Sequence, residues 1–231
     1  MNIATPDHFF TGQIVFEGIR WETYEALLED LSWRRLRLTY DEGVLEIMSP
    51  RLDHERFKTL LGRMVEALTE ELRIPMVSAG STTWKRFVKK KGFESDESYY
   101  IQNERRMRGK IDFDPEVDPP PDLAIEVEIT KSALDRLGIF AAFGVPEIWR
   151  YDGKRLRFAI LQKNGEYKPS PTSRAFPFLR PAQIERHLAA LKKTDETTWI
   201  RAFRKWVRET FGEKSEPRPR RARGRPRRRP E

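Results

Sequence analysis

The sequence predicts an α/β protein built on a central mixed β-sheet that is flanked by helices. Apolar residues recur at steps of three and four between Phe57 and Leu72, which indicates a long amphipathic helix. Short runs rich in β-branched and aromatic residues, separated by turn residues, indicate strands before and after this helix. A further helical run between two strands is typical of the crossover that joins parallel strands.

The elements of the first half follow from the same patterns. In order, they are an arm or loop (1–13), a helix (21–31), the two strands of a hairpin (36–39 and 44–48), the long helix, extended chain (76–88), an exposed turn (89–92) and a strand (96–101). Asp41 and Gly43 are turn residues and favour the hairpin. Asp53 is expected to cap the long helix, and Pro75 to end it.

The second half opens with a connection over 104–121 that has no periodicity and ends in three consecutive prolines. Loops of this length are more often functional than idle. The remaining elements are a strand (122–129), a helix (132–143), two strands (147–151 and 155–161) and two helices (181–192 and 195–211). Thr194 or Asp195 is expected to cap the last helix.

The composition excludes several classes of site. The chain has no cysteine, so it holds no disulfide, no cysteine-ligated zinc and no thiol nucleophile. Its three histidines, His8, His54 and His187, lie far apart and form no metal-binding pair. No apolar run reaches the length of about 18 residues that a membrane span needs, and no secretory signal pattern appears, so we expect a cytoplasmic protein.

The net charge of +8 is concentrated at the C-terminus. Residues 217–231 contain eight arginines and one glutamate, which gives +7 and leaves +1 for the rest of the chain. The body is therefore nearly neutral.

Three acids share one face of the predicted strand 122–129. Asp122, Glu126 and Glu128 alternate with apolar residues that point to the opposite face. In one interpretation this is an edge strand, or a strand with a solvated face. In the other, the acids line a cleft and hold a divalent cation, because Mg²⁺ takes carboxylate oxygens. Glu46 also lies among apolar neighbours in the predicted strand 44–48, and Asp96 begins the predicted strand 96–101 after a turn that contains glycine; both could join this group.

Several linked motifs resemble the bacterial Uma-two family. They are Tyr40-Asp41-x-Gly43-x-Leu45-Glu46-Ile47-Met48-Ser49-Pro50 followed by His54, Ser81-Thr82-Thr83-Trp84-Lys85-Arg86, the run 96–104, Pro119-Pro120-Pro121-Asp122-Leu123-Ala124-Ile125-Glu126-Val127, and Gly144-Val145-Pro146-Glu147-Ile148-Trp149. The resemblance covers about residues 10–190. It implies a restriction-endonuclease-like PD-(D/E)XK fold and a DNA endonuclease that cleaves phosphodiester bonds with water activated by Mg²⁺ or Mn²⁺.

The same resemblance implies the site residues. Asp96 takes the place of the motif aspartate, although Ser95 precedes it rather than proline, and Glu126 takes the place of the second acid, so both are expected to hold the metal. Glu128 stands where the motif has lysine. Glu46 and Glu128 are expected to act as supporting acids, and the missing cation is expected from Arg136 or Lys131.

Other residues have two open interpretations. His54 could orient a phosphate or could be a packing residue at the start of the long helix. Asp122 is expected to be structural, because strand geometry places it too far from Glu126 to share one metal ion. The basic residues of the 104–121 connection form either a solvated face or a rim that contacts phosphates.

The C-terminal tail has no aromatic or branched aliphatic residue and is expected to be disordered alone. Arg223-Gly224-Arg225-Pro226-Arg227 resembles an AT-hook, a peptide that enters the narrow minor groove of A·T-rich DNA. An unspecific polybasic tail, or one that binds RNA, is the alternative. We expect an endonuclease domain over 1–212 and a tail over 213–231.

DNA is the expected partner, with homodimerisation and association with the nucleoid as further expectations. Two other functions stay open. One is a catalytically silent DNA-binding module, because the motif lysine is replaced. The other is an interaction protein whose acidic strand face is merely solvated.

Overall fold

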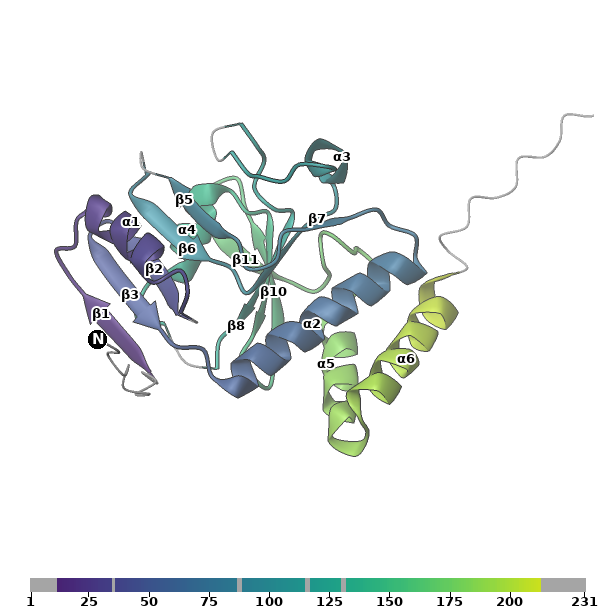
Figure 1. Cartoon of the computed structure of the whole chain (residues 1–231). Coiled ribbons are helices and arrows are strands. Elements are labelled where there is room, and N and C mark those ends of the chain that lie inside the picture. Colours follow the sequence, from purple (N-terminus) through teal and green to yellow (C-terminus); the bar gives the residue numbers. More distant parts are fainter. Residues whose placement is uncertain (1–11, 35, 87–88, 115–116, 130–131, 213–231) are drawn as a thin grey trace, which may run out of the picture.

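The computed structural model describes residues 12–212, apart from residues 35, 87–88, 115–116 and 130–131 (Figure 1). Within this range the strands form two sheets that lie side by side. Helices cover both faces of the larger sheet. The predicted α/β class is confirmed, with the strands divided between two sheets rather than gathered in one.

The N-terminal sheet is antiparallel and has the order β1-β3-β2-β6-β5. Its strands are β1 (Gln13–Phe16), β2 (Arg37–Asp41), β3 (Val44–Met48), β5 (Thr83–Arg86) and β6 (Lys91–Glu94). The predicted hairpin is β2–β3, and its two turn residues, Glu42 and Gly43, both have positive φ. Helix α1 (Trp21–Asp30) packs on this sheet and contributes Trp21 and Tyr24 to its core.

The larger sheet is mixed and has the order β11-β10-β9-β8-β7-β4. Its strands are β4 (Val77–Ser78), β7 (Glu97–Tyr100), β8 (Leu123–Val127), β9 (Glu147–Tyr151), β10 (Leu156–Leu161) and β11 (Tyr167–Ser170). Only β8 and β9 run parallel among its described pairs. Helix α4 (Arg136–Phe143) connects them, as expected for a parallel pair.

The two faces of β8 pack against different helices. Leu123, Ile125 and Val127 join a core with α2 (Leu52–Glu71), α5 (Pro181–Ala190) and α6 (Glu196–Val207). Ala124 faces α4 in a second core. Figure 1 shows α2, α5 and α6 grouped on one side of the mixed sheet. Because β8 is covered on both faces, any charged side chain on it must find a partner inside the protein.

Helix α6 is part of this main core. Trp199, Phe203 and Val207 are buried in it, and the π-helical turn that follows (Arg208–Gly212) adds Phe211. Arg204 and Arg208 pair with Glu71 at the end of α2, with N–O distances of 3.0 and 2.8 Å. The predicted cap Asp195 accepts hydrogen bonds from the backbone of Thr197 and Thr198.

Strand β1 was not predicted: it overlaps the predicted arm (1–13) at Gln13 alone, and it pairs with the edge of β3. Residues 1–11 of that arm lie outside the described residues. Two predicted helix starts were wrong. The long helix begins at Leu52 with Arg51 as its N-cap residue, so Asp53 lies inside the first turn and its carboxylate accepts from His54 N instead. Helix α4 begins four residues later than predicted, because Ser132 and Ala133 bind the carboxylate of Glu46.

Two loop assignments were also wrong in part. The connection after β7 contains a short helix, α3 (Glu104–Met107). The turn predicted over 89–92 ends early, because Lys91 and Gly92 belong to β6. None of the helices in the described part of the chain has the length and apolar character needed to cross a bilayer.

Gly92 is required by a close contact between α1 and the N-terminal sheet. A Cβ atom at this position would lie 2.7 and 2.8 Å from two ring carbons of Tyr24. The Tyr24 ring is fully buried and stacks on Tyr40, with ring centroids 5.0 Å apart. The ring therefore has no room to move away.

We expect Gly92→Ala to lower the free energy of unfolding by about 1–3 kcal/mol, the usual cost of overpacking a core. Urea denaturation of the purified protein measures this loss. Gly212→Ala is the matched control, because a Cβ atom there would have no neighbour within 4 Å. Equal stabilities of the two variants would show that Tyr24 can be displaced cheaply.

Candidate active site

A cavity of about 220 Å³ opens beside the end of β8, where the two sheets meet. Its walls come from both sheets, from the first turn of α2 and from the start of α4. The lining residues are Arg37, Met48, His54, Asp96, Glu126, Val127, Glu128, Ser132, Leu134, Asp135, Arg136, Leu137 and Arg150. The sequence-predicted residues Asp96, Glu126, Glu128 and Arg136 are therefore brought together in one cavity.

Asp96 lies between β6 and β7 and is fully buried. Its Oδ2 accepts a hydrogen bond from the backbone N of Val127 at 2.6 Å and lies 3.1 Å from Nε2 of His54. Its Oδ1 forms an ion pair with Arg37. Each contact comes from a different element, so the position of this carboxylate depends on β2, α2 and β8 together.

Glu126 lies on β8 and is also buried, with 4% of its surface exposed. Its Oε2 accepts from Nε of Arg136 at 2.9 Å and lies 2.6 Å from Nη2 of the same guanidinium. Its Oε1 faces the backbone N of Asp96 at 3.4 Å. Burial raises the pKa of Glu126, and the charges of Arg136 and Arg37 oppose this rise.

Arg136 connects the larger sheet to the N-terminal sheet. Besides Glu126, its guanidinium donates to Oγ1 of Thr39 on β2 at 2.9 Å and to the carbonyl of Glu94 on β6 at 3.0 Å. It is the first residue of α4, so the same contacts fix where that helix begins. The sequence predicted Arg136 as a cation near the acids, and the structure places it in direct contact with Glu126.

Arg37 was missed by the sequence reasoning. It is buried on β2. Burial lowers the pKa of its guanidinium, and the negative charges of Glu126 and Glu55 oppose this fall. A second bond joins its Nη2 to Glu55 Oε1 at 3.5 Å. Arg37 and Thr39 alternate with Leu38 and Tyr40, so a polar face on this strand was visible in the sequence. The sequence did not show which residue pairs with that face, because Asp96 is far from Arg37 in the chain.

His54 also lies in direct contact with the acids. Its Nε2 faces Asp96, and its Nδ1 lies 3.2 Å from Oε1 of Glu55. The hydrogen bond from His54 lowers the pKa of Glu55 to about 2. The ring is therefore held between two carboxylates at the start of α2.

Glu128 forms the third acid–arginine pair of the cavity. Both of its oxygens accept from Arg150, Oε1 from Nε and Oε2 from Nη2, each at 2.8 Å. The two side chains are 26% and 32% exposed, so this pair lies nearer to solvent than the other two. Asp96, Glu126 and Glu128 are thus matched by Arg37, Arg136 and Arg150.

Glu46 does not line the cavity but supports its wall. The carboxylate accepts from Gln13 on β1, from Oγ of Ser132 at 2.9 Å and from the backbone N of Ala133 at 2.8 Å. It therefore holds the segment that leads into α4. Asp122 binds the backbone of Ile101 and Asn103 at 2.7 and 2.8 Å, in agreement with the structural role predicted for it.

The chemistry of the donors fits a divalent cation. Asp96, Glu126 and Glu128 offer carboxylate oxygens to one cavity, and such oxygens are ligands for Mg²⁺ or Mn²⁺. Among the described residues, however, no three histidine or acidic side chains converge closely enough to hold a metal ion by themselves. A cation bound by Asp96 and Glu126 has to share these carboxylates with Arg37 and Arg136.

Two further predicted sites lie outside the described residues. These are Lys131, the alternative cation, and the AT-hook-like residues Arg223, Gly224, Arg225, Pro226 and Arg227. The basic residues of the 104–121 connection do not line the cavity. Two of them, Arg108 and Lys110, pair with Glu104 and Asp118.

Comparison with protein families identifies a match over most of the chain. The model of the family Uma2, described as "Putative restriction endonuclease", matches residues 21–191. This stretch contains every residue that lines the cavity. No curated protein matches the chain.

The buried position of Glu126 predicts how stability depends on Arg136. Arg136→Met leaves a buried carboxylate without its partner, and we expect a loss of about 3–5 kcal/mol in the free energy of unfolding. Arg150→Met is the matched control, because Glu128 stays near solvent and the loss is expected to be about 0–1 kcal/mol. Urea denaturation at neutral pH measures both.

The loss of unfolding free energy in Arg136→Met is also expected to change with pH. Without Arg136, the pKa of Glu126 rises further, so the folded state prefers the neutral acid more strongly. An acid with a raised pKa contributes stability below its unfolded pKa and loses that contribution as pH rises through its folded pKa. The difference in the free energy of unfolding between wild type and variant should therefore widen as pH rises above the ordinary pKa of a glutamate. A gap that narrows with rising pH would contradict the assigned pair.

Proposed function

The chain belongs to the Uma2 family, and from this membership and the acidic cavity we propose that it is a metal-dependent DNA endonuclease. The observation that carries the proposal is the meeting of Asp96 and Glu126, thirty positions apart in the chain, in one cavity within the matched region. A purely solvated acidic face would not bury these carboxylates. Asp96 is fully buried and Glu126 is 4% exposed.

In this proposal Asp96 and Glu126 hold the Mg²⁺ or Mn²⁺ ion. The ion supplies an activated water for attack on the phosphodiester. His54 orients Asp96 through its Nε2 and is itself fixed by Glu55. The contact of Val127 N with Asp96 fixes the same carboxylate from the other side.

The arginines take the part of the missing lysine. A guanidinium stays protonated, so Arg37 and Arg136 can stabilise negative charge on a phosphate but cannot take a proton from water. Arg136 is held by three acceptors, which keeps its charge at a fixed place beside Glu126. The pair of Glu128 and Arg150 lies nearer to the solvent, and in this proposal Arg150 contacts a phosphate of the DNA strand as it enters.

The pairing of each acid with an arginine also favours a second function. A cavity whose carboxylates are already neutralised has less need of a metal ion. The replacement of the motif lysine by Glu128 also favours this second function. The alternative is therefore a catalytically silent module that binds DNA.

Cleavage of supercoiled plasmid DNA tests these functions. We expect nicking that requires Mg²⁺ or Mn²⁺, and its loss by a factor of at least about 10² in Asp96→Asn and Glu126→Gln, because an ordered metal and its water are lost. The matched controls are Asp30→Asn and Glu29→Gln, exposed acids of α1 that do not line the cavity.

The outcomes separate the two functions. Nicking that survives both substitutions places the chemistry at other residues and contradicts the proposed site. DNA binding without nicking, at every metal concentration tried, supports the silent module. Thermal unfolding of each variant accompanies the assay, because removing one partner of a buried pair also affects stability.

We further propose that the tail anchors the protein to DNA. The body carries a net charge of only +1, whereas residues 217–231 carry +7, so the tail offers the larger share of phosphate contacts. Arg223, Gly224, Arg225, Pro226 and Arg227 supply an A·T preference through the narrow minor groove.

A chain that ends at Glu216 is expected to bind DNA with a weaker dependence on salt. The slope of log affinity against log salt concentration falls by about 0.9 for each phosphate contact that is lost. Fluorescence anisotropy over a salt series measures it, and A·T-rich and G·C-rich duplexes of equal length test the preference. An unchanged slope would show that the body of the protein, and not the tail, makes the main contacts with DNA.

A further inference from the structure

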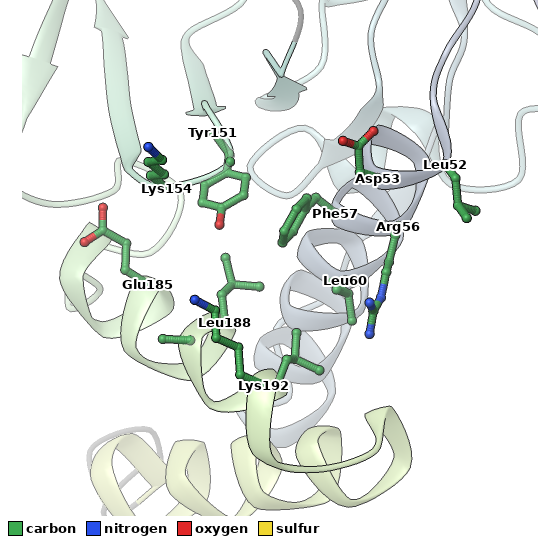
Figure 2. Close-up of a pocket in the computed structure, with 13 residues that line it drawn as sticks. Leu52, Asp53, Arg56, Phe57, Leu60, Tyr151, Lys154, Glu185, Leu188 and Lys192 are labelled. Atoms are coloured by element: carbon green, nitrogen blue, oxygen red, sulfur yellow. The ribbon is translucent and has the colours of Figure 1, made fainter.

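A second and larger cavity lies apart from the acidic one. Its volume is about 630 Å³, within the range typical of small-molecule sites. It lies between α2, the turn from β9 to β10, and α5 with the 3₁₀ turn Leu191–Lys193 (Figure 2). None of its lining residues also lines the acidic cavity.

The walls of this cavity are apolar and partly aromatic. Phe57 on α2 and Tyr151 at the end of β9 face each other with ring centroids 5.0 Å apart and a tilt of 59°. Leu60 and Leu188 line it from α2 and α5. Figure 2 shows these side chains converging on one open centre, with the Tyr151 hydroxyl pointing into it. Such walls suit a flat aromatic group.

The rim has unmatched positive charge. Lys154 and Lys192 are exposed, and no contact of their ammonium groups with an acid is found among the described residues. Of the other charged residues that line the cavity, Asp53 pairs with Arg51 at 3.3 Å and Arg56 with Glu196 at 3.0 Å. Glu185 accepts from the backbone N of Leu156 at 2.7 Å and keeps its negative charge. The two lysines outnumber this one carboxylate, so the charge left for a ligand is positive, which favours an anion.

The two cavities share their dividing elements. On β9, Arg150 turns to the acidic cavity and its neighbour Tyr151 to the aromatic one. On α2, His54 lines the acidic cavity, and Phe57, within one turn of it, lines the aromatic cavity. A polymer held at the acidic cavity therefore has a second cavity next to it, on the other side of the start of α2.

We propose that this second cavity binds one nucleotide, with the base against Phe57 and Tyr151 and the phosphate at Lys154 and Lys192. The nucleotide would belong to the DNA strand that flanks the cleaved bond, and this choice of source rests on the proposed function. A free nucleotide has the same chemistry and is the other source. Base stacking on aromatic side chains is tolerant of sequence, so the site would hold a strand without reading it.

Isothermal titration calorimetry with the full chain tests the site. The probes are deoxyadenosine monophosphate, deoxyadenosine without phosphate, and a short single-stranded oligonucleotide. All titrations contain EDTA, which withholds the metal ion that the proposed cleavage needs. We expect the double variant Lys154→Ala/Lys192→Ala to weaken binding of the phosphorylated probes by about tenfold or more, as for the loss of charged hydrogen bonds. Phe57→Leu should weaken all three probes.

The matched control is Lys163→Ala/Lys193→Ala. These lysines are also exposed, and Lys193 neighbours Lys192, but neither lines the cavity. Equal affinities of the two double variants for both phosphorylated probes would overturn the proposal. Weakened binding of the oligonucleotide alone identifies DNA as the source, and weakened binding of the mononucleotide identifies a free nucleotide as a ligand.

These outcomes are independent of cleavage. If the wild-type protein binds the probes through this cavity but never nicks plasmid DNA, the endonuclease proposal fails and the nucleotide site stands. If plasmid is nicked and the lysine and Phe57 variants bind all probes as the wild type does, the site fails and the endonuclease proposal stands.

Discussion

The buried ion pair of Glu126 and Arg136 is the interaction on which the arrangement of the molecule depends. Arg136 binds Glu126 on β8, Thr39 on β2 and the carbonyl of Glu94 on β6, so one guanidinium joins the two sheets. Glu126 in turn faces the backbone of Asp96. A charge buried without a partner costs several kcal/mol, so this geometry has few alternatives. The acidic cavity exists because the sheets are held together at this point.

The sequence predicted what depends on local periodicity. The end of the long helix, the hairpin β2–β3 and the strand Glu147–Tyr151 follow from patterns of apolar and turn residues, which act over a few positions. Strand β1 and the late start of α4 did not follow. The first needs a partner edge on β3, and the second needs a carboxylate, Glu46, that is distant in the chain.

In the site, too, local features could be predicted and contacts between distant residues could not. Glu126 and Glu128 stood out because acids among apolar strand residues are unusual, and Asp96 was indicated by the family resemblance; the structure brings all three into one cavity. Their arginine partners were harder to foresee, because ion pairing depends on which strands become neighbours. Arg37 was visible only as a polar residue beside Thr39, and nothing local indicated Asp96 as its partner. The second cavity was not foreseen at all, since its walls come from separate parts of the chain.

The packing of α6 separates the unit that folds from the unit that sequence comparison recognises. The family match ends at residue 191, yet Trp199, Phe203, Val207 and Phe211 lie in the same core as β8 and α2. A fragment cut at the end of the match would expose that apolar surface to water and would lose the contacts of Arg204 and Arg208 with Glu71. Work on an isolated domain should therefore keep the chain through Gly212, because the recognisable segment is shorter than the cooperative one.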